Sequence, residues 1–207
     1  MKQNMRKRTP LAVLLALCLA MQLCVPAAMA SNRLMRAGDA AIAQIEEEEG
    51  FRAEKYSSGG KWYIGYGTEC GAEDYPEGIT REEAELLLMS KVEAYEAKLN
   101  DFFDRYDVTP TQGQFDALIC FSYNFGTGWM SGTSDLVKIA RGEKDATRLE
   151  VAHAFGEWCH SGGQAQAGLA DRRMQEAAIY LDDSTRAAEN EFAYLIINME
   201  SGASYET

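Results

Sequence analysis

One short segment interrupts the helical patterning of this chain. Residues 51–67 hold four glycines, and their apolar residues do not recur at helical intervals. Within this segment, Lys61-Trp62-Tyr63-Ile64 is an aromatic and β-branched run with turn-forming residues on both sides. This composition predicts a small hairpin or three-stranded ribbon. Because the sequence on both sides has helical periodicity, we predict an α+β fold that is mostly α-helical, with the ribbon as its smaller lobe.

Helices are predicted before and after the ribbon. The first covers Leu34 to Glu49 and ends at Gly50, a residue type that commonly terminates helices. Thr80-x-x-Glu83 is a capping box that begins a long helix, which we expect to join the small lobe to a larger helical lobe. Thr111-x-x-Gln114 begins another helix, which is apolar almost all round and should lie at the centre of that lobe. Three more helices are predicted, from Ser134 or Asp135 to near Gly142, from about Asp145 to Trp158, and from Leu169 to Leu181.

The first thirty residues have the pattern of a secretory signal peptide. A basic start is followed by an apolar run from Leu11 to Val25, and Ala28-Met29-Ala30 is a small-residue cleavage pattern. The run is shorter than the about 20 residues of a membrane-spanning helix, so an uncleaved anchor is the less favoured alternative. We expect cleavage near Ala30 and a secreted product. Residues 31–183 then form one domain, and residues 184–207 form an acidic C-terminal helix or tail.

The chain is strongly acidic. Its formal net charge is −12, and the first 30 residues hold four basic and no acidic side chains. The remainder therefore has 16 Lys and Arg against 32 Asp and Glu, a net charge of −16. Such a charge disfavours nucleic acid and anionic membranes as partners, and we predict a monomer that binds no nucleic acid.

Cysteine and histidine usage indicates neither a metal site nor a histidine-based triad. Removal of the leader leaves Cys70, Cys120 and Cys159, an odd number that leaves at least one free thiol or an intermolecular bridge. Cys120 lies in an apolar helical run and is interpreted as a core residue, whereas a Cys70–Cys159 pair stays open. His153 and His160 have no cysteine or acidic residue at ligand spacing. We therefore predict no metal and no cofactor.

Glu49 differs from the other acidic residues around it. Glu46 and Glu47 are interpreted as solvated members of a charge run. Glu49 follows Ile45 by four residues, so it lies on the apolar face of the first predicted helix, at its end. A carboxyl group beside apolar neighbours holds its proton more readily, as a general acid requires. Glu49 is therefore our candidate for general acid catalysis.

Three motifs follow one another along residues 38–181. They are Glu49-Gly50-Phe51-Arg52 with Tyr56 and Ile64-Gly65-Tyr66-Gly67; Gln114-Phe115-Asp116-Ala117-Leu118 with Phe121, Tyr123-Asn124 and Gly126; and Gly168-Leu169 with Arg172-Arg173 and Glu176. In this order and at this spacing they resemble the phage-type lysozymes, glycoside hydrolase family 24. The resemblance implies a lysozyme-like fold with two lobes joined by a long helix. It also implies a muramidase, which cleaves the β-1,4 bond between N-acetylmuramic acid and N-acetylglucosamine in peptidoglycan.

The resemblance also suggests site residues and a partner. Glu49 matches the general acid, and the peptidoglycan glycan strand is the implied partner. Residues 31–183 are then expected to be a catalytic domain that is secreted or associated with the cell wall. Trp62 and Tyr66 suit stacking on sugar rings, while Gln114 and Asn124 either line the cleft or cap helix ends. Three further motif residues are interpreted as structural partners of nearby groups: Asp116, Arg172 and Arg173.

The ribbon departs from the family pattern at its catalytic positions. Ser58 stands where the family usually has an aspartate, and Tyr63 stands where it usually has a threonine, in a segment one residue shorter. Thr68 stands where a histidine usually follows the second glycine. Serine cannot act as a carboxylate base for an attacking water. Ser58 and Tyr63 are therefore the two catalytic positions beside Glu49 at which the chemistry differs.

Three explanations of this departure are open. Another carboxylate, from Glu69, Glu73 or Asp74, supplies the base. Alternatively, the protein acts like a lytic transglycosylase, in which one glutamate suffices because the muramic acid 6-hydroxyl attacks and a 1,6-anhydro product forms. In the third explanation the protein binds peptidoglycan without cleaving it. Aromatic residues of the ribbon suit sugar stacking in all three, so they do not discriminate.

Overall fold

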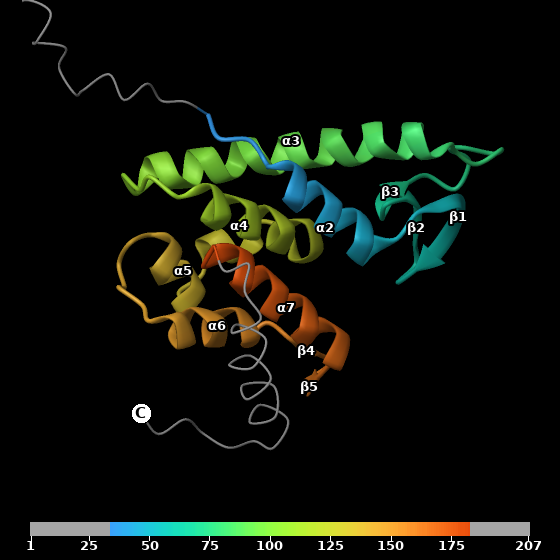
Figure 1. The fold of residues 1–207 in the computed structure, drawn as a ribbon. Coiled ribbons are helices and arrows are strands. Elements are labelled where there is room, and N and C mark those ends of the chain that lie inside the picture. The colour runs from blue at the N-terminus through green and yellow to red at the C-terminus, as the bar shows by residue number, and fades with distance from the viewer. Residues whose placement is uncertain (1–33, 183–207) are drawn as a thin grey trace, which may run out of the picture. The chain divides into compact units, whose positions relative to one another are not determined.

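The computed structural model describes residues 34–182, and from Met35 onward these form one compact unit (Figure 1). The elements are α2 (Asp39–Glu49), β1 (Arg52–Ser58), β2 (Lys61–Gly65), β3 (Thr68–Cys70), α3 (Arg81–Arg105), α4 (Gln112–Phe125), the 3-10 helix η1 (Gly128–Ser131), α5 (Asp135–Ala140), α6 (Arg148–Gly156), β4 (His160–Ser161), β5 (Gln164–Ala165) and α7 (Ala167–Tyr180). The predicted signal peptide and the predicted tail at 184–207 lie outside the described residues. The mostly helical α+β class is confirmed.

The predicted ribbon is a three-stranded antiparallel sheet in the order β1-β2-β3. Gly59 and Gly60 connect the first two strands, and both have positive φ, 57° and 80°. Such a pair forms the two-residue turn that matches the twist of a hairpin. The turn fixes the register, so Ser58 pairs with Lys61 and Tyr56 pairs with Tyr63. The short segment between Tyr56 and Ile64 is therefore a hairpin with a two-residue turn.

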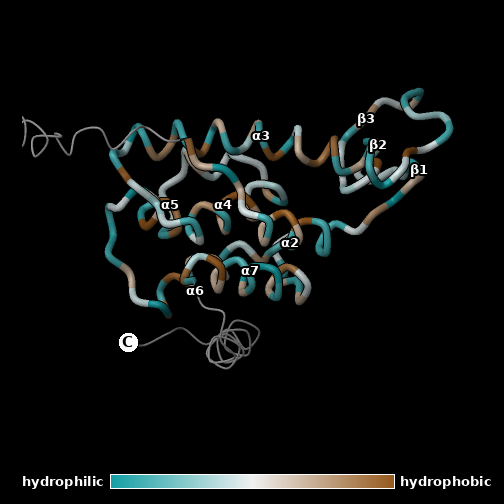
Figure 2. Tube along the Cα trace, turned by 45° about the horizontal axis from the view of Figure 1, so that its top comes forward, coloured by the Kyte–Doolittle hydropathy of each residue, from teal (hydrophilic) through white to brown (hydrophobic). Residues whose placement is uncertain are grey.

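α3 joins the sheet to the helical part of the molecule, as predicted. Its first turn is closed by the capping box, in which the Thr80 hydroxyl accepts from the Glu83 N–H and the Glu83 carboxylate accepts from the Thr80 N–H. α3 contacts β2 and β3 near its start and α4 farther along. Figure 1 shows α3 running from the sheet past α2 and α4. Hydrophobic residues recur along α3 at helical intervals (Figure 2).

α4 lies at the centre of the helical part. Every residue from Phe115 to Tyr123 is buried, and α4 contacts α2, α3 and α7. Thr111 and Gln114 form the predicted capping box at its start. Asp116 is buried and accepts a hydrogen bond from the Gly38 N–H at 2.9 Å, which is the structural role predicted for it. The predicted central helix is confirmed.

The first helix begins later than predicted. Residues 34–38 are not helical, and α2 starts at Asp39. The backbone N–H groups of Met35, Ala37 and Gly38 donate instead to side chains, those of Asn100, Glu96 and Asp116. Because distant side chains satisfy these donors, the segment gains nothing from another helical turn. The helix end at Glu49, which positions the candidate acid, is as predicted.

The C-terminal helices also follow the prediction, with one addition. α6 begins at Arg148 rather than near Asp145 because Thr147 and Glu150 form a third capping box. The break at Ser161-Gly162-Gly163 is a two-stranded hairpin, β4-β5, whose glycines have φ of 61° and 80°. In the part of the chain from 34 to 182, no helix is long and apolar enough to cross a membrane.

Candidate active site

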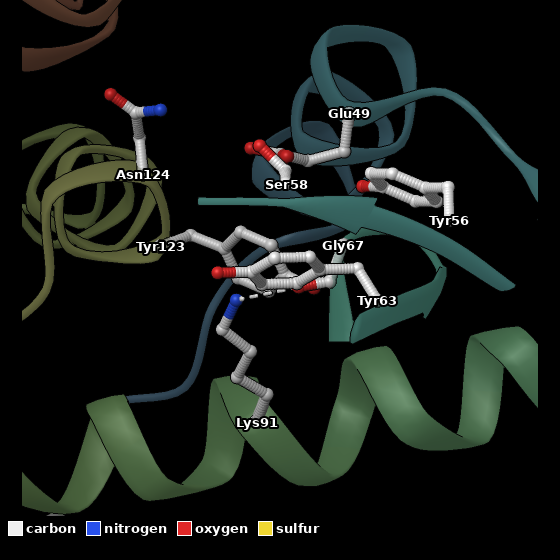
Figure 3. Close-up of a pocket in the computed structure, with 8 residues that line it drawn as sticks. All are labelled: Glu49, Tyr56, Ser58, Tyr63, Gly67, Lys91, Tyr123 and Asn124. Carbon is white, nitrogen blue, oxygen red and sulfur yellow. Dashed lines mark hydrogen bonds between the residues drawn. The ribbon is translucent and has the colours of Figure 1, made fainter. Parts of the chain in front are cut away.

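A cavity of about 220 Å³ lies between the sheet and the helices (Figure 3). α2, the sheet with the turn after β2, α3 and α4 all contribute to its wall, so residues far apart in sequence meet there. The lining residues are Glu49, Tyr56, Ser58, Tyr63, Gly67, Lys91, Tyr123 and Asn124. The cavity therefore brings together the three predicted catalytic positions and one of the four predicted binding residues.

Glu49 is the last residue of α2 and reaches the cavity from the helix end. Its side chain is 21% exposed, which shields the carboxylate but leaves it accessible. A Cβ atom built on Gly67 would lie 3.0 Å from Glu49 Oε2, and Gly67 has a φ of 73°. Only glycine adopts this backbone region without strain, and only glycine leaves the carboxylate this much room. Gly67 therefore leaves room for the Glu49 side chain at the cavity.

Arg172 holds the other oxygen of Glu49. Its Nη2 atom lies 2.8 Å from Glu49 Oε1, and its side chain is 8% exposed. The sequence interpretation expected Arg172 to pair with an acidic neighbour but did not place it at the candidate acid. One signal was available, because Arg172 lies on the apolar face of α7. A buried guanidinium needs a carboxylate partner. Sequence spacing could not show that the carboxylate belongs to α2.

Behind this pair lies a buried polar network. Arg173 Nη2 donates to Glu176 Oε1 at 2.8 Å and to Asn124 Oδ1 at 3.0 Å. Glu176 Oε1 also lies 3.6 Å from Arg172 Nε, so one carboxylate joins both guanidiniums. Burial raises the pKa of Glu176, and the two guanidiniums oppose this shift. Through Arg173 the network orients Asn124 at the cavity, and through Arg172 it supports Glu49.

Ser58 and Tyr63 reach the cavity from the hairpin. Ser58 is the exposed last residue of β1, and Tyr63 faces Tyr56 across the strand pair with ring centroids 5.7 Å apart. Figure 3 shows both residues at the cavity, with Ser58 on the same side as Glu49. Neither side chain is a carboxylate, so the hairpin supplies hydroxyl groups to this cavity and no acidic base.

The three nearby carboxylates considered as replacements do not line the cavity. Glu69 is exposed and pairs with Lys61 at 2.8 Å. Asp74 accepts a hydrogen bond from the Gly71 N–H at 2.7 Å, which closes the loop after β3. Glu73 is exposed in the same loop. Among the described residues, Glu49 is therefore the single carboxylate in the cavity lining.

Three of the predicted binding residues lie elsewhere. Trp62 is 40% exposed and points away from the cavity because neighbouring residues of a strand face opposite sides of the sheet. Tyr66 is 1% exposed, and its hydroxyl accepts from Arg81, so its ring belongs to the core. Gln114 closes the capping box of α4 and lines a different cavity. None of these three residues lines this cavity, and their contact with sugar stays a prediction.

Lys91 and Tyr123 are cavity residues that the sequence interpretation missed as such. Lys91 Nζ lies 3.8 Å from the centroid of the Tyr123 ring and 3.5 Å from the Gly67 carbonyl oxygen. The Tyr123 hydroxyl donates to the Tyr66 carbonyl oxygen at 2.7 Å, and burial raises the pKa of Tyr123. Desolvation lowers the pKa of Lys91, while Glu49 opposes that shift. One signal was available, since Lys91 lies at helical spacing between the partly buried Leu87 and Tyr95 of α3.

None of the three cysteines of the described residues lines this cavity. Cys70, Cys120 and Cys159 are free thiols, and Cys120 is buried in the core as predicted. Over residues 34–182, no group of three or more histidine, cysteine, aspartate or glutamate side chains is arranged to hold a metal ion.

Comparisons with known proteins show the family and the fold to which the chain is similar. Residues 46–176 match the phage lysozyme family. The chain is 33% identical over 165 residues to an endolysin of Bacillus phage B103, a match that covers 76% of this chain and 58% of that protein. The chain thus spans little more than half the length of this relative.

Two solved structures are similar over most of their length. The endolysin from Escherichia coli O157:H7 phage FAHEc1 is 32% identical with a TM-score of 0.60, covering 72% of this chain and 94% of that one. The muramidase domain of SpmX from Asticaccaulis excentricus is 28% identical with a TM-score of 0.56, covering 70% and 97%. The predicted lysozyme-like fold is confirmed by these likenesses.

Proposed function

The chain belongs to the phage lysozyme family, and on this premise we propose that it cleaves the glycan strands of peptidoglycan with Glu49 as the general acid. The bond proposed is the β-1,4 link between N-acetylmuramic acid and N-acetylglucosamine. The observation that carries this proposal is the placement of Glu49, a shielded but accessible carboxylate at a helix end inside a cavity. No other carboxylate of the described residues lines that cavity.

The two oxygens of Glu49 have different neighbours, which suggests different tasks. Arg172 holds Oε1, and Oε2 lies over Gly67. A proton delivered from Oε2 to the glycosidic oxygen promotes departure of the N-acetylglucosamine unit while an oxocarbenium-like centre develops at C1 of the muramyl ring. Glu49 is then a carboxylate and accepts a proton from the incoming hydroxyl group. In hydrolysis that hydroxyl belongs to water, and the product has a reducing end.

The single carboxylate also favours a second candidate reaction. With no base opposite Glu49, the 6-hydroxyl of the muramyl unit is an alternative nucleophile. It attacks C1, the bond from C1 to the leaving oxygen breaks, and the proton of the 6-hydroxyl passes to Glu49. The product is a 1,6-anhydro sugar, which differs in mass from the hydrolysis product by one water.

Digestion of purified peptidoglycan tests both candidates. We expect wild-type protein to release soluble fragments and the Glu49→Gln variant to release them at least about 100-fold more slowly, the lower end of a general acid's contribution. Mass spectrometry of the fragments distinguishes reducing from anhydro ends. Saturable binding to peptidoglycan without fragment release would instead support a non-catalytic binding protein, and undiminished release by the variant would exclude Glu49 as the acid.

The N-terminal pattern supports a proposal about location. Residues 1–30 act as a signal peptide, and cleavage after Ala30 leaves a domain of residues 31–183 with the segment 184–207 behind it. Export carries the protein to the compartment that holds its substrate. Mass determination of the exported protein tests this, because the expected mature N-terminus is Ser31 and a retained leader would contradict the proposal.

A further inference from the structure

Lys91 is a charged residue whose role the reaction above leaves unexplained. It projects from α3 into the cavity, half-buried, toward Tyr123 and Gly67 (Figure 3). An ammonium group has three donors, and besides its contact with the Tyr123 ring Lys91 makes one long hydrogen bond, 3.5 Å to the Gly67 carbonyl oxygen. Within residues 34–182, no carboxylate lies within ion-pair distance of Lys91. Lys91 therefore retains donors that a ligand can use.

The other basic groups near the cavity have carboxylate partners, whereas Lys91 has none at ion-pair distance among the described residues. Arg172 already pairs with Glu49, and Lys61 already pairs with Glu69. Burial of an ammonium group without a carboxylate partner is unfavourable. The ammonium group of Lys91 is therefore placed to bind an anionic ligand in the cavity.

We propose that Lys91 binds a carboxylate of the muramyl unit and makes the site select carboxylate-bearing glycans over neutral ones. This proposal rests on the proposed function and deepens it. Glu49 and Lys91 reach the cavity from opposite sides in Figure 3, so a muramyl ring held at Glu49 presents its substituents toward α3. The carboxylate belongs either to the lactyl ether of the sugar or to the peptide attached to it. The shared chemistry is one carboxylate meeting one desolvated ammonium.

Binding of short products tests this without any turnover. The disaccharide N-acetylglucosaminyl-N-acetylmuramic acid lacks the bond that a muramidase cuts, so it serves as a stable ligand for protein with Glu49 intact. Calorimetric titration compares this free acid with its lactyl methyl ester, which removes the charge and adds one methyl group. We expect the wild-type protein to bind the acid about tenfold more tightly, and added salt to reduce only the affinity for the acid.

Substitutions assign the preference to Lys91. We expect Lys91→Met to remove the difference between acid and ester, and Lys91→Arg to preserve most of it. Lys98→Met is the matched control, because Lys98 is an exposed lysine of the same helix whose ammonium contacts Thr127 outside the cavity. A preference for the acid that survives in Lys91→Met, or equal binding of acid and ester by wild-type protein, would overturn the proposal.

A third ligand identifies the source of the carboxylate. The same disaccharide with a peptide on its lactyl group has lost the lactyl charge and gained peptide carboxylates. Tight binding that depends on Lys91 for this ligand assigns the contact to the peptide, whereas a preference confined to the free acid assigns it to the lactyl group. If the protein cleaves peptidoglycan but binds acid and ester equally, only the role of Lys91 is contradicted. If it neither cleaves nor binds, the proposed function is contradicted as well.

Discussion

Glu49 is positioned by two residues that lie far from it in sequence. Arg172 fixes one carboxylate oxygen from α7, and Gly67 leaves room for the other at the turn after β2. The glycine matters in two ways, because its φ of 73° disfavours side chains and Glu49 Oε2 lies only 3.0 Å from its Cβ position. A glycine that has a positive φ but no neighbour at its Cβ position separates these two effects.

Gly67→Ala is expected to lower both stability and cleavage. The strained backbone costs about 1–2 kcal/mol, and the added methyl group displaces the Glu49 carboxylate. Gly163→Ala is the control, since Gly163 has a φ of 80° and nothing within 4 Å of its Cβ position. We expect similar losses in the free energy of unfolding for both variants, measured by urea titration. A loss of fragment release should appear in Gly67→Ala only; an equal loss in both would contradict the role of Gly67.

At the scale of elements, the β1–β2 hairpin decides which chemistry the cavity offers. Its Gly59-Gly60 turn ends β1 at Ser58, at the cavity and on the side of Glu49. The hairpin thus presents a hydroxyl group, and no carboxylate, on the side of the cavity that holds Glu49. A single substitution there tests whether the missing carboxylate limits hydrolysis.

Ser58→Asp is expected to raise the share of reducing ends among the products. A carboxylate at this exposed position activates water, and we expect a gain on the order of tenfold in hydrolysis, below the 10²–10⁴-fold of a well-positioned base. The matched variant Ser58→Asn has nearly the same shape without the charge and should leave the product ratio unchanged. An unaltered ratio in Ser58→Asp would show that the hairpin does not place this residue against the attacking water.

The elements were predictable from sequence because their signals are local. Capping boxes at Thr80 and Thr111 and the turn-rich ribbon each lie within a few neighbouring residues. The start of α2 was not predictable, since its preceding N–H groups bond to side chains of α3 and α4. The site followed the same rule. Glu49 is found from its place at a helix end, but its pairing with Arg172 and the position of Lys91 depend on how distant helices pack.

At the scale of the whole molecule, the buried network ties three helices together. Glu176 and both guanidiniums belong to α7. Asn124 lies near the end of α4, and Glu49 is the last residue of α2. Glu176 is 1% exposed, so its oxygens have no access to bulk water. Stability and the geometry of the site therefore depend on the same carboxylate.

Glu176→Gln is expected to destabilise the fold by about 3 kcal/mol, because two buried guanidiniums lose their shared carboxylate. Asp171→Asn is the matched control, with the same chemical change at an exposed position of α7. Thermal unfolding measures the difference. We also expect slower fragment release from the folded Glu176→Gln protein, since Arg172 loses its support behind Glu49. A melting temperature equal to that of the control would mean that the network contributes little.

The enclosed position of Lys91 has a kinetic consequence. A negatively charged protein repels a polyanionic strand at long range, and one ammonium inside a cavity is too short-ranged to reverse this. Strands that bear carboxylates therefore do not arrive faster than neutral ones, and they differ in how long they stay. Selectivity of this kind acts on residence time, and on a repeating polymer each longer stay favours a second cut in the same strand before release.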